Sequence, residues 1–467
     1  MAIENSKNNS LIQIIESWSI TEDVINPTDE ILQWIKQKNK SIHVEIKKVN
    51  YDYNGDWHYD KLSGQIVNQS KTFFSISGIK KTGDNGSLLQ EQPIIVQREI
   101  GYLGIICKRI HGVMYFLMQA KIEPGNINKI QLSPTLQATK SNFMQAHGGA
   151  VPAYLDYFSR KKEYEVIVDQ IQSEQSSRFI GKRNRNIIIV VDDEVEVLDS
   201  HKWMTLGQIK QLMKIDNLVN MDTRTVISCI PFAMRNYEDH ELAHIKAMFT
   251  SQALFNSMFS GDSGVQINTI FQYLNEEKML DSSSVQLCDL SELESWKLQN
   301  GEIQGKDKPF KVIFCNIDIE GREIRSWSQP LIEATGESIF ALIYRDVDHK
   351  REFLVHAISE IGCFDHIEIG PSVQIETKKK QMDNVETLFF ERLMGKRGVR
   401  FDGLFSEEGG RFYHEQNRNI LMEIEENELS KLPEGYFWVD FYTLNILVQF
   451  NNCLNIQLRN LLSILDL

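Results

Sequence analysis

Short apolar runs and helix-spaced apolar residues alternate along this chain and predict a mixture of strands and helices. The polar, then mildly amphipathic N-terminus predicts a tail and a leading helix. Residues 29–38 place apolar side chains at helical spacing, with Thr28 or Asp29 as N-cap. From residue 42 to 132, apolar runs are separated by turn-forming dipeptides, as in consecutive strands. Residues 113–120 are nearly all apolar, which predicts a central strand covered on both faces.

Strands and helices also alternate beyond residue 150. Residues 151–169 have the pattern of a helix, and residues 187–191 that of a buried strand. After Thr205, apolar residues recur at i, i+3, i+6 and i+7, which predicts an amphipathic helix that covers a sheet face. A second helix is expected over residues 220–227, and the chain is expected to close with helices within residues 438–467.

A long segment of the chain occurs twice. Residues 92–140 align without a gap on residues 329–377 at a constant offset of 237. The matched positions include Gln92 on Gln329, Phe116 on Phe353, Glu123 on Glu360, Gly125 on Gly362, Pro134 on Pro371 and Gln137 on Gln374. With small changes of offset the match extends to both sides and places residues 169–186 on residues 402–419. This pattern predicts a tandem duplication of one unit of roughly 200 residues, a size typical of domains.

The repeat divides the chain into two modules. The first is expected over residues 1–235 and the second over residues 266–467, with a linker over residues 236–265 that has no partner in the repeat. Each module combines a largely antiparallel sheet with flanking helices. The predicted fold class is therefore α+β, a mixed α/β sandwich.

Charge and composition narrow the possible functions. The 467 residues carry a formal net charge of -14, and the basic clusters are too short to form a basic face, which argues against general nucleic-acid binding. The first residues do not resemble a secretion signal, and no stretch is long and apolar enough to span a membrane. The six cysteines are widely separated without a CxxC pair, so we expect structural thiols. A cytoplasmic enzyme or binding protein fits these features best.

Three groups of residues are candidates for a binding site. The first, residues 132–143 (LSPTLQATKSNF), follows a strand and carries six polar groups within eight positions. A sugar or phosphate ligand needs such a density of donors and acceptors, although an ordinary polar turn has a similar composition. The persistence of Pro134 and Gln137 in the second copy, as Pro371 and Gln374, favours binding.

The second group is SEQSSRF at residues 173–179, matched by SEEGGRF at residues 406–412. Small residues before an arginine let the backbone approach an anion that the guanidinium then binds through two hydrogen bonds. A structural ion pair at i and i+4, between the arginine and the glutamate of each motif, would explain the pattern equally well.

The third group is the pair of tryptophans Trp57 and Trp296, which occupy matching positions in the two copies. A tryptophan can stack on a nucleobase or cover a sugar face, but it is more often a core residue. We therefore expect the core role to be the commoner of the two.

Several long motifs resemble one known family. Residues 98–143, 169–189 and 203–228 are strongly similar to the NDP-hexose 2,3-dehydratases of deoxysugar biosynthesis. Residues 322–333 and 406–413 are similar to the C-terminal half of the same family. The resemblance covers nearly the whole chain.

The resemblance implies a fold and a reaction. The family has two Nudix-like modules per chain that lack the metal-binding Nudix box, and it forms dimers. It acts on dTDP-4-keto-6-deoxyglucose with no metal or redox cofactor. None of Arg98-Glu99, Arg322-Glu323 and Arg351-Glu352 is followed here by the paired glutamates of that box. The expected product is the unstable dTDP-3,4-diketo-2,6-dideoxyhexose, which a downstream ketoreductase would consume. The alternative is a catalytically inert nucleotide-sugar binding protein of the same fold.

The resemblance also implies site residues. The candidate acids and bases are the titratable residues of the first module's motifs, Lys140, His147 and Glu174. The candidate substrate-binding residues are Trp57, Thr139, Lys140, Ser141, Asn142, Phe143, Ser173, Arg178, Trp296, Gln374, Ser406, Gly409, Gly410 and Arg411, with Arg178 as a diphosphate clamp and no metal ligand.

This sequence departs from the family pattern at three positions. Ser176 stands where glycine is more frequent, Phe143 where tyrosine is common, and Gln90 where the second copy has Trp327. Phe143 has no hydroxyl group, so it cannot be a proton donor. Because the second copy also replaces the polar loop with ETKKK at residues 376–380, we expect the chemistry mainly in the first module's pocket. The second pocket would then be auxiliary or structural.

Overall fold

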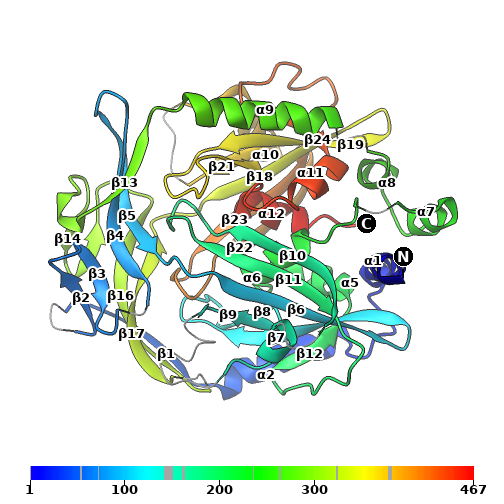
Figure 1. The fold of residues 1–467 in the computed structure, drawn as a ribbon, viewed down its shortest axis with the longest axis horizontal. Helices are drawn as coiled ribbons and strands as arrows, with labels where there is room; N and C mark the ends of the chain where they lie inside the picture. The colour runs from blue at the N-terminus through cyan, green and yellow to red at the C-terminus, as the bar shows by residue number, and fades with distance from the viewer. Residues whose placement is uncertain are drawn as a thin grey trace.

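The computed structural model describes residues 2–467 apart from residues 53–54, 72, 141–150, 160–162, 235, 262–263, 322–323 and 377–380. Within these residues the strands form two seven-stranded and two five-stranded sheets, flanked by helices, so the predicted α+β class is confirmed. Figure 1 shows the two large sheets on the right and the two smaller ones on the left. We call residues 1–235 the N-terminal half and residues 236–467 the C-terminal half.

The large sheet of the N-terminal half has the order β10-β11-β6-β7-β12, with β8 paired to β7 and β9 to β6. Its strands are β6 (Gly101–Ile110), β7 (Val113–Ile122), β8 (Ile130–Ser133), β9 (Leu136–Ala138), β10 (Glu165–Ser173), β11 (Arg183–Val190) and β12 (His201–Met204). Strand β11 runs parallel to β6, and the other pairs are antiparallel. The central strand predicted over residues 113–120 is confirmed as β7, which lies between β6 and β12.

The large sheet of the C-terminal half has the corresponding order β22-β23-β18-β19-β24, with β20 paired to β19 and β21 to β18. Its strands are β18 (Ile339–Val347), β19 (Lys350–Ile358), β20 (Glu368–Pro371), β21 (Val373–Ile375), β22 (Val399–Ser406), β23 (Gln416–Glu423) and β24 (Tyr436–Asp440). The parallel pair recurs as well, because β18 runs parallel to β23.

One hydroxyl group joins the strands at the same place in each large sheet. The two central strands, β6 and β7 or β18 and β19, diverge there. The chain passes from one to the other at Pro134-Thr135, between β8 and β9, or at Pro371-Ser372, between β20 and β21. Thr135 Oγ1 accepts a hydrogen bond from Ile106 N at 2.9 Å and donates one to the carbonyl of Leu117. Ser372 Oγ bonds to the backbone of Ile343 and Leu354 in the same way. This structural role accounts for part of the repeated motif.

The two smaller sheets each contain strands from both halves. Strand β1 of the N-terminal half pairs with β16 of the C-terminal half, and β13 of the C-terminal half pairs with β4 of the N-terminal half. The first sheet comprises β1 (Val44–Val49), β14 (Lys297–Gln299), β15 (Glu302–Gln304), β16 (Phe310–Ile319) and β17 (Ser326–Ala334). The second comprises β2 (Trp57–Asp60), β3 (Gln65–Asn68), β4 (Ser75–Thr82), β5 (Leu88–Val96) and β13 (Ser284–Cys288).

Most of the predicted helices are present. The leading helix is α1 (Ala2–Ser19), and the helix expected at residues 29–38 is α2 (Thr28–Ser41). The N-cap position of α2 is Pro27, which has no side-chain capping bond, so Thr28 and Asp29 were wrong as caps. The remaining predicted helices are α5 (Leu206–Met213), α6 (Met221–Ser228), α11 (Phe441–Leu447) and α12 (Ile456–Ser463).

The helix predicted over residues 151–169 is wrong for most of its length. Only α4 (Leu155–Phe158) is helical among its described residues, and β10 begins at Glu165. The β-branched residues Val166, Ile167 and Val168 favour the strand there. The expected linker contains helices α7 (Asp239–Lys246) and α8 (Gln252–Phe259). The C-terminal half adds α9 (Gly264–Leu280), the short 3₁₀ helix η1 (Leu290–Glu292) and α10 (Asn384–Met394).

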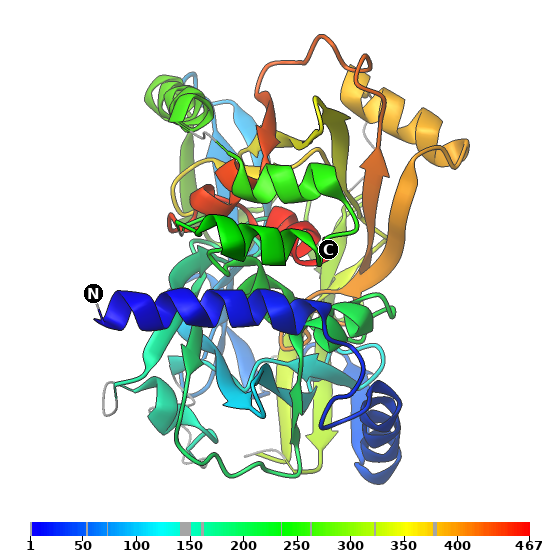
Figure 2. The ribbon, with the colours of Figure 1, turned by 90° about the vertical axis from the view of Figure 1, so that its right-hand side faces the viewer.

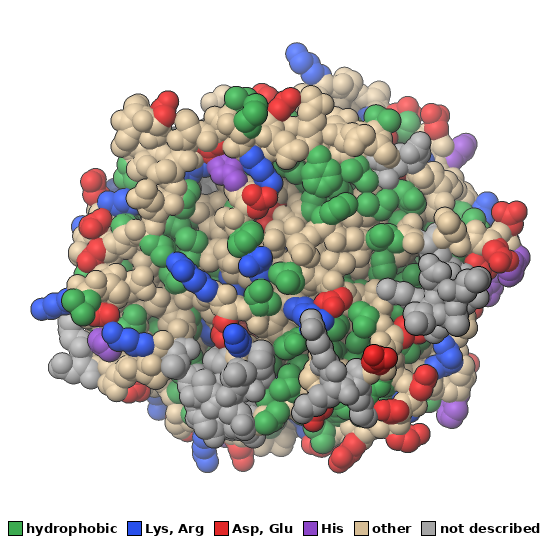
Figure 3. Space-filling model, in the orientation of Figure 1, with side chains coloured by type: hydrophobic (Ala, Val, Ile, Leu, Met, Phe, Trp, Pro, Cys, Tyr) green, Lys and Arg blue, Asp and Glu red, His purple; other side chains and the backbone are tan. Residues whose placement is uncertain are grey.

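The N-terminal helix and the C-terminus lie side by side. Figure 2 shows α1 beside the C-terminal end of the chain, with α8 on the other side of that end. The Trp18 indole N–H donates to Asp466 Oδ1 at 3.3 Å, and the Lys210 ammonium donates to the Leu465 carbonyl at 3.0 Å. On the face seen in Figure 3, acidic and basic side chains are interspersed among the described residues. None of the helices that the structure describes combines the length and apolar composition needed to cross a lipid bilayer.

Candidate active site

Two equivalent helices, α6 and α12, pack against each other between the large sheets (Figure 1). We call residues 173–179 and 406–412 the arginine motifs. Each helix carries a fully buried arginine of its own, whose guanidinium contacts the arginine motif of the opposite half. Arg224 on α6 donates from Nη2 to the Ser406 carbonyl at 2.9 Å. Arg459 on α12 donates to the Ser173 carbonyl in the equivalent bond. Arg224 and Arg459 thus join the two halves at Ser406 and Ser173, the first residues of the motifs.

The backbone of each motif also accepts a hydrogen bond from a glycine of the opposite half. Gly125 N donates to the Gly409 carbonyl at 2.7 Å, and Gly362 N donates to the Ser176 carbonyl at 2.9 Å. A Cβ atom on Gly125 or Gly362 would collide with these motif backbones, which explains why both positions are glycine. The docking places Arg411 against the N-terminal half and Arg178 against the C-terminal half. Sequence reasoning had assigned each arginine to the pocket of its own half. In the structure each arginine lies in the pocket of the opposite half, Arg178 beside Glu376 and Arg411 beside Phe74.

The pocket around Arg178 is acidic. The Arg178 side chain is 2% exposed, and its Nη1 forms an ion pair with Glu376 Oε2 at 2.8 Å. Its guanidinium carbon lies 4.2 Å from the centroid of the Phe310 ring. Burial alone would lower the pKa of Arg178, but the charges of Glu376 and Glu415 raise it above its usual value. Arg178 therefore already has an anionic partner within the protein.

The pocket around Arg411 is different. Its guanidinium carbon lies 4.0 Å from the centroid of the Phe74 ring, and Nη1 donates to the Gly410 carbonyl at 2.7 Å. The repeat places Thr139 where the other pocket has Glu376. Arg411 has no ion pair with a described residue and is partly exposed. Desolvation lowers its pKa, while the charge of Glu408 opposes that change. A charged guanidinium with unused donors is therefore available to an anionic ligand.

Several equivalent positions differ in charge between the Arg411 pocket and the Arg178 pocket. They include Lys182 and Glu415, Lys121 and Ile358, Thr139 and Glu376, Glu408 and Gln175, Asp222 and Gln457, and Glu99 and Gly336, naming the residue of the Arg411 pocket first. Lys182 is buried and donates from Nζ to the Glu99 carbonyl at 2.7 Å; Lys121 Nζ lies 3.7 Å from Glu123 Oε1. The Arg411 pocket thus combines an arginine and two lysines with the carboxyl groups of Glu99, Glu123, Glu174, Glu408 and Asp222, whereas the Arg178 pocket has carboxyl groups but no lysine at the positions equivalent to Lys182 and Lys121.

A hydrogen-bonded chain of side chains recurs in both pockets. Gln137 Nε2 donates to Glu123 Oε1 at 3.0 Å, and Asn220, the N-cap of α6, donates to Gln137 Oε1 at 3.1 Å. Glu360, Gln374 and Asn455 repeat these bonds at 2.9 Å each in the C-terminal half. Gln374, expected to bind substrate, is therefore part of the Arg178 pocket, and this chain explains why its glutamine recurs.

Glu174, Glu408 and Glu415 have raised pKa values. Glu174, a candidate acid or base, is buried and accepts from Asn184 Nδ2 at 2.6 Å, and burial raises its pKa. Desolvation and the nearby charge of Glu123 raise the pKa of Glu408 to about 8. Burial raises the pKa of Glu415 in the other pocket to about 8. The motif glutamates bond to asparagines, and Arg178 pairs with Glu376 rather than with Glu174, so the i, i+4 pair considered as an alternative for this motif is not formed.

Both tryptophans lie behind the arginines as buried core residues. Trp57 packs against Phe74, with ring centroids 4.8 Å apart, and its indole N–H donates to the Ser328 carbonyl at 2.7 Å. Trp296 packs in the same way against Phe310, with centroids 4.7 Å apart. Each tryptophan therefore supports the aromatic ring on which an arginine rests. Phe74, rather than the half-exposed Phe73, takes the place equivalent to Phe310.

The other predicted site residues have the following places. Ser173 Oγ donates to Glu368 Oε2 at 2.9 Å, and Ser406 Oγ accepts from Gln131 Nε2 at 2.7 Å. Gly409 packs against Asn126, and Gly410 leaves room for the Glu408 carboxylate, which accepts from Gly410 N at 2.8 Å. Thr139 and the exposed Lys140 follow β9. Ser141, Asn142, Phe143 and His147 lie outside the described residues.

Sequence reasoning did not identify Lys121, Lys182, Glu408 or Asp222 as site residues. The signal was present in the repeat, because these are positions where two otherwise similar copies differ in charge. Among the residues that the structure describes, no three His, Cys, Asp or Glu side chains are grouped so that they could hold a metal ion.

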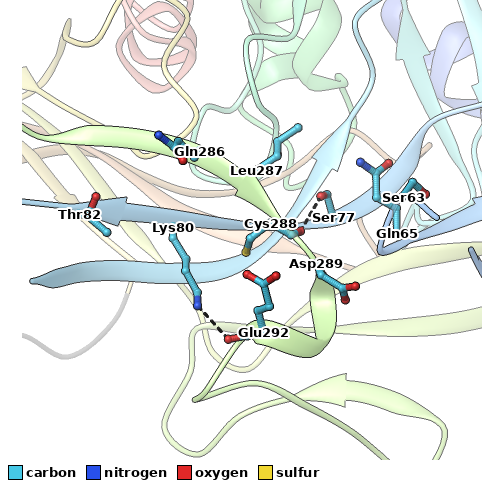
Figure 4. Close-up of a pocket in the computed structure, with 10 residues that line it drawn as sticks. All are labelled: Ser63, Gln65, Ser77, Lys80, Thr82, Gln286, Leu287, Cys288, Asp289 and Glu292. Atoms are coloured by element: carbon cyan, nitrogen blue, oxygen red, sulfur yellow. Dashed lines mark hydrogen bonds between the residues drawn. The ribbon is translucent and has the colours of Figure 1, made fainter. Parts of the chain in front are cut away.

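A hollow of about 440 Å³ lies away from both arginine pockets, beside the pairing of β4 with β13. Figure 4 shows Lys80 reaching the backbone carbonyl of Glu292, at 2.9 Å, across this hollow. Ser77 Oγ bonds to the Cys288 carbonyl at 3.2 Å. The polar groups that line this hollow thus help to join β4 of the N-terminal half to β13 and the residues that follow it in the C-terminal half.

The protein thus has two equivalent pockets, each completed by an arginine from the opposite half, and the two pockets differ in their charged residues. Comparison with known proteins identifies its family. The model of the NDP-hexose 2,3-dehydratase family matches residues 28–230 and again residues 267–465. The chain belongs to this family, and the resemblance found in its sequence is confirmed.

Three curated relatives carry the same name, dTDP-4-dehydro-6-deoxy-alpha-D-glucopyranose 2,3-dehydratase. The protein from Saccharopolyspora spinosa is 38% identical over 443 residues, which cover 94% of this chain and 91% of the relative. The protein from Amycolatopsis orientalis is 33% identical over 97% of this chain and 93% of its own. The protein from Streptomyces violaceoruber is 33% identical over 92% of this chain and 95% of its own.

Proposed function

We propose that this protein removes water across C2 and C3 of dTDP-4-keto-6-deoxyglucose and releases the dTDP-3,4-diketo-2,6-dideoxyhexose. The family membership and the shared name of three relatives support the reaction. The observation that carries the choice of site is the difference in cations between the pockets: Arg178 is paired with Glu376, whereas the Arg411 pocket adds Lys121 and Lys182 to an arginine that could bind a diphosphate.

The reaction needs a base, an acid and a stabilised oxyanion. The C4 ketone acidifies the hydrogen at C3, so a base removes it and an enolate forms. The C2–O bond then breaks, the C2 hydroxyl leaves as water with a proton from an acid, and a C2=C3 double bond forms. The enol at C3 tautomerises to the ketone. Donors aimed at the C4 oxygen stabilise the enolate.

We assign the diphosphate to Arg411 rather than to Arg178. Arg178 is buried and paired with Glu376, so an anionic ligand would have to displace a carboxylate that the protein already supplies. Arg411 rests on Phe74, and the position equivalent to Glu376 in its pocket is Thr139, which carries no charge. Thr139, Lys140, Ser141, Asn142 and Phe143 would contact the nucleotide-sugar, and Lys140, His147 and Glu174 stay the candidates for the base.

The Arg178 pocket has an auxiliary or structural role in this proposal. Glu376 already pairs with its arginine, Glu360 and Glu415 lie near it, and neither Lys182 nor Lys121 has a basic equivalent there, so this pocket offers fewer cations to a dianionic ligand. The residues of this pocket, Arg178 and Gln374 among them, would then join the halves instead of contacting the substrate.

We further propose that the two halves are Nudix-like modules that arose by tandem duplication, over residues 1–235 and 266–467, with residues 236–265 between them. The twofold match of the family model and the common strand order of the two large sheets support this origin. A cytoplasmic homodimer, with a downstream ketoreductase that consumes the diketone, completes the proposal.

The test is to incubate the purified protein with dTDP-4-keto-6-deoxyglucose and follow the nucleotide-sugar by mass spectrometry. A ketoreductase with its nicotinamide cofactor traps the unstable product. We expect the substrate to lose one water before it is reduced. An unchanged substrate that nevertheless protects the protein against heat would contradict this function and support the inert binding protein.

A further inference from the structure

Asp222 is a buried carboxyl group that the proposed site does not yet use. It lies in the first turn of α6, two residues after the N-cap Asn220, and only 2% of its surface is exposed. Its carboxyl group makes no hydrogen bond or ion pair with the part of the chain that the structure describes. Burying a carboxyl group without a partner costs folding free energy. Such a cost is typical of functional positions.

The hydrogen bonds from Asn220, the N-cap two residues before Asp222, to Gln137 and from Gln137 to Glu123 place the turn of Asp222 beside the Arg411 pocket. The groups that act on its charge are Glu174, Glu408, Glu123 and Lys121, all of which belong to that pocket. The turn that carries it is fixed, because Asn220 bonds to Gln137 and Thr223 Oγ1 donates to the Leu132 carbonyl at 3.2 Å. The side chain is thus held in place by its backbone and not by its own bonds.

The other pocket provides an internal comparison. The equivalent position on α12 is Gln457, which is equally buried and whose amide nitrogen makes no hydrogen bond. An amide therefore fits at this position of the helix pair. Of these two equivalent positions, the one with a carboxyl group lies in the pocket that we assign to the substrate. Because an amide packs equally well in the other pocket, packing alone does not explain the carboxyl group of Asp222.

We propose that Asp222 is the acid that protonates the departing C2 hydroxyl group of the substrate. In this step the Asp222 O–H bond breaks and its proton joins the C2 oxygen, which leaves as water with the electrons of the C2–O bond. The enolate electrons form the C2=C3 double bond. Asp222 regains a proton from solvent after the water has left. This inference rests on the proposed function.

Protonation of Asp222 before the reaction is consistent with its environment. Burial and the charges of Glu174, Glu408 and Glu123 raise its pKa well above that of an exposed aspartate, and Lys121 opposes them. The carboxyl group is thus kept neutral, as a hydrogen-bond donor must be.

The test separates the two halves of the reaction in deuterated water. A protein without the acid should still remove the C3 hydrogen, so Asp222→Asn should return substrate that contains one deuterium at C3. Loss of water should fall by about 100-fold to 10,000-fold, the usual contribution of a positioned acid. Asp222→Glu should recover part of the water loss. The matched control, Gln457→Asn, changes the equivalent turn of α12 and should leave both rates within about threefold of the wild type.

Two results would overturn the inference. One is water loss by Asp222→Asn at the wild-type rate. The other is a folded Asp222→Asn protein, with an unchanged thermal unfolding temperature, that has lost exchange and water loss together, since that result points to the base or to a structural role. If the wild type neither exchanges nor loses water, the proposed function fails, and this inference fails with it.

Discussion

Arg178 and Arg411 show how the same residue in the same repeated motif can serve different purposes. Each rests on an aromatic ring with a tryptophan behind it. One partner position decides the difference, because Glu376 neutralises Arg178 while Thr139 stands at the equivalent place beside the other motif. The sequence identified both arginines as candidates, but only the contacts between the halves show which pocket each one enters.

We predict that Glu376→Thr destabilises the protein without lowering the turnover number. The substitution leaves Arg178 buried beside fewer negative charges, and removing one partner of a buried ion pair costs about 3 to 5 kcal/mol. Because Glu376 is 17% exposed, we expect about 1 to 3 kcal/mol in urea unfolding. Asp199→Asn, which breaks the exposed pair with Lys38, is the control and should cost less than about 1 kcal/mol. A loss of turnover in folded Glu376→Thr would show that the Arg178 pocket takes part in catalysis.

Glu368 should make stability fall as the pH rises. Burial raises its pKa to about 7, so the folded state holds a proton that the unfolded state releases from about pH 4.5 upward. Its stabilising contribution is complete below pH 4.5 and is lost as the pH passes through 7. Glu368→Gln removes this titration, and the equivalent Gln131 shows that an amide can bond to the motif serine.

Urea unfolding of the wild type and of Glu368→Gln at pH 5.5 and pH 8.5 tests this prediction. The variant should gain more than about 1 kcal/mol relative to the wild type between these values, since one pKa unit corresponds to about 1.4 kcal/mol. A difference between the two proteins that does not change with pH would show that Glu368 is ionised in the folded protein throughout.

At the scale of elements, two tight turns fix the contact between the halves. Gly125 and Gly362 each lie against the backbone of the opposite motif, where no side chain fits. The helices after residues 205 and 220 could be predicted because their apolar residues follow the helical period. The docking of the turns could not, because it joins segments more than 180 residues apart.

We predict that Gly362→Ala destabilises the protein by about 1 to 3 kcal/mol, the usual effect of forcing extra atoms into a packed site. The Cβ atom would meet the carbonyl oxygens of Ser176 and Phe179, which belong to the backbone and cannot turn away. Gly336→Ala is the matched control, because its Cβ would meet no atom within 4 Å, and it should change the stability by less than about 1 kcal/mol. Equal stabilities of the two variants in urea unfolding would show that the turn can relax.

At the scale of the whole molecule, the two halves are interlocked. Strand β1 completes a sheet of the C-terminal half, and β13 completes a sheet of the N-terminal half. The repeat predicted two similar units and the α+β class, because both follow from local patterns. It did not predict the exchange of strands, since long-range pairing leaves no trace in the periodicity of a single segment.

We predict that neither half folds stably alone. Fragments 1–249 and 250–467, divided in the loop between α7 and α8, would each lack a strand of one small sheet and expose the buried surface between α6 and α12. Size-exclusion chromatography and urea unfolding should show aggregation or no cooperative transition for single fragments, and a stable complex after co-expression. The control is the intact chain cut in the same loop after folding, which should stay assembled. Cooperative unfolding of a monomeric fragment 1–249 would contradict interlocking.

The most direct test of the account is the comparison of Arg411→Gln with Arg178→Gln in the dehydration of dTDP-4-keto-6-deoxyglucose. The two variants change the same residue of the same motif, so differences in their turnover report on the pockets. We expect Arg411→Gln to lower kcat/KM by about 10-fold to 100-fold, as the loss of a charge-assisted bond to a diphosphate implies. Folded Arg178→Gln should stay within about threefold of the wild type. The reverse order of the two effects would place the reaction in the Arg178 pocket and contradict the account.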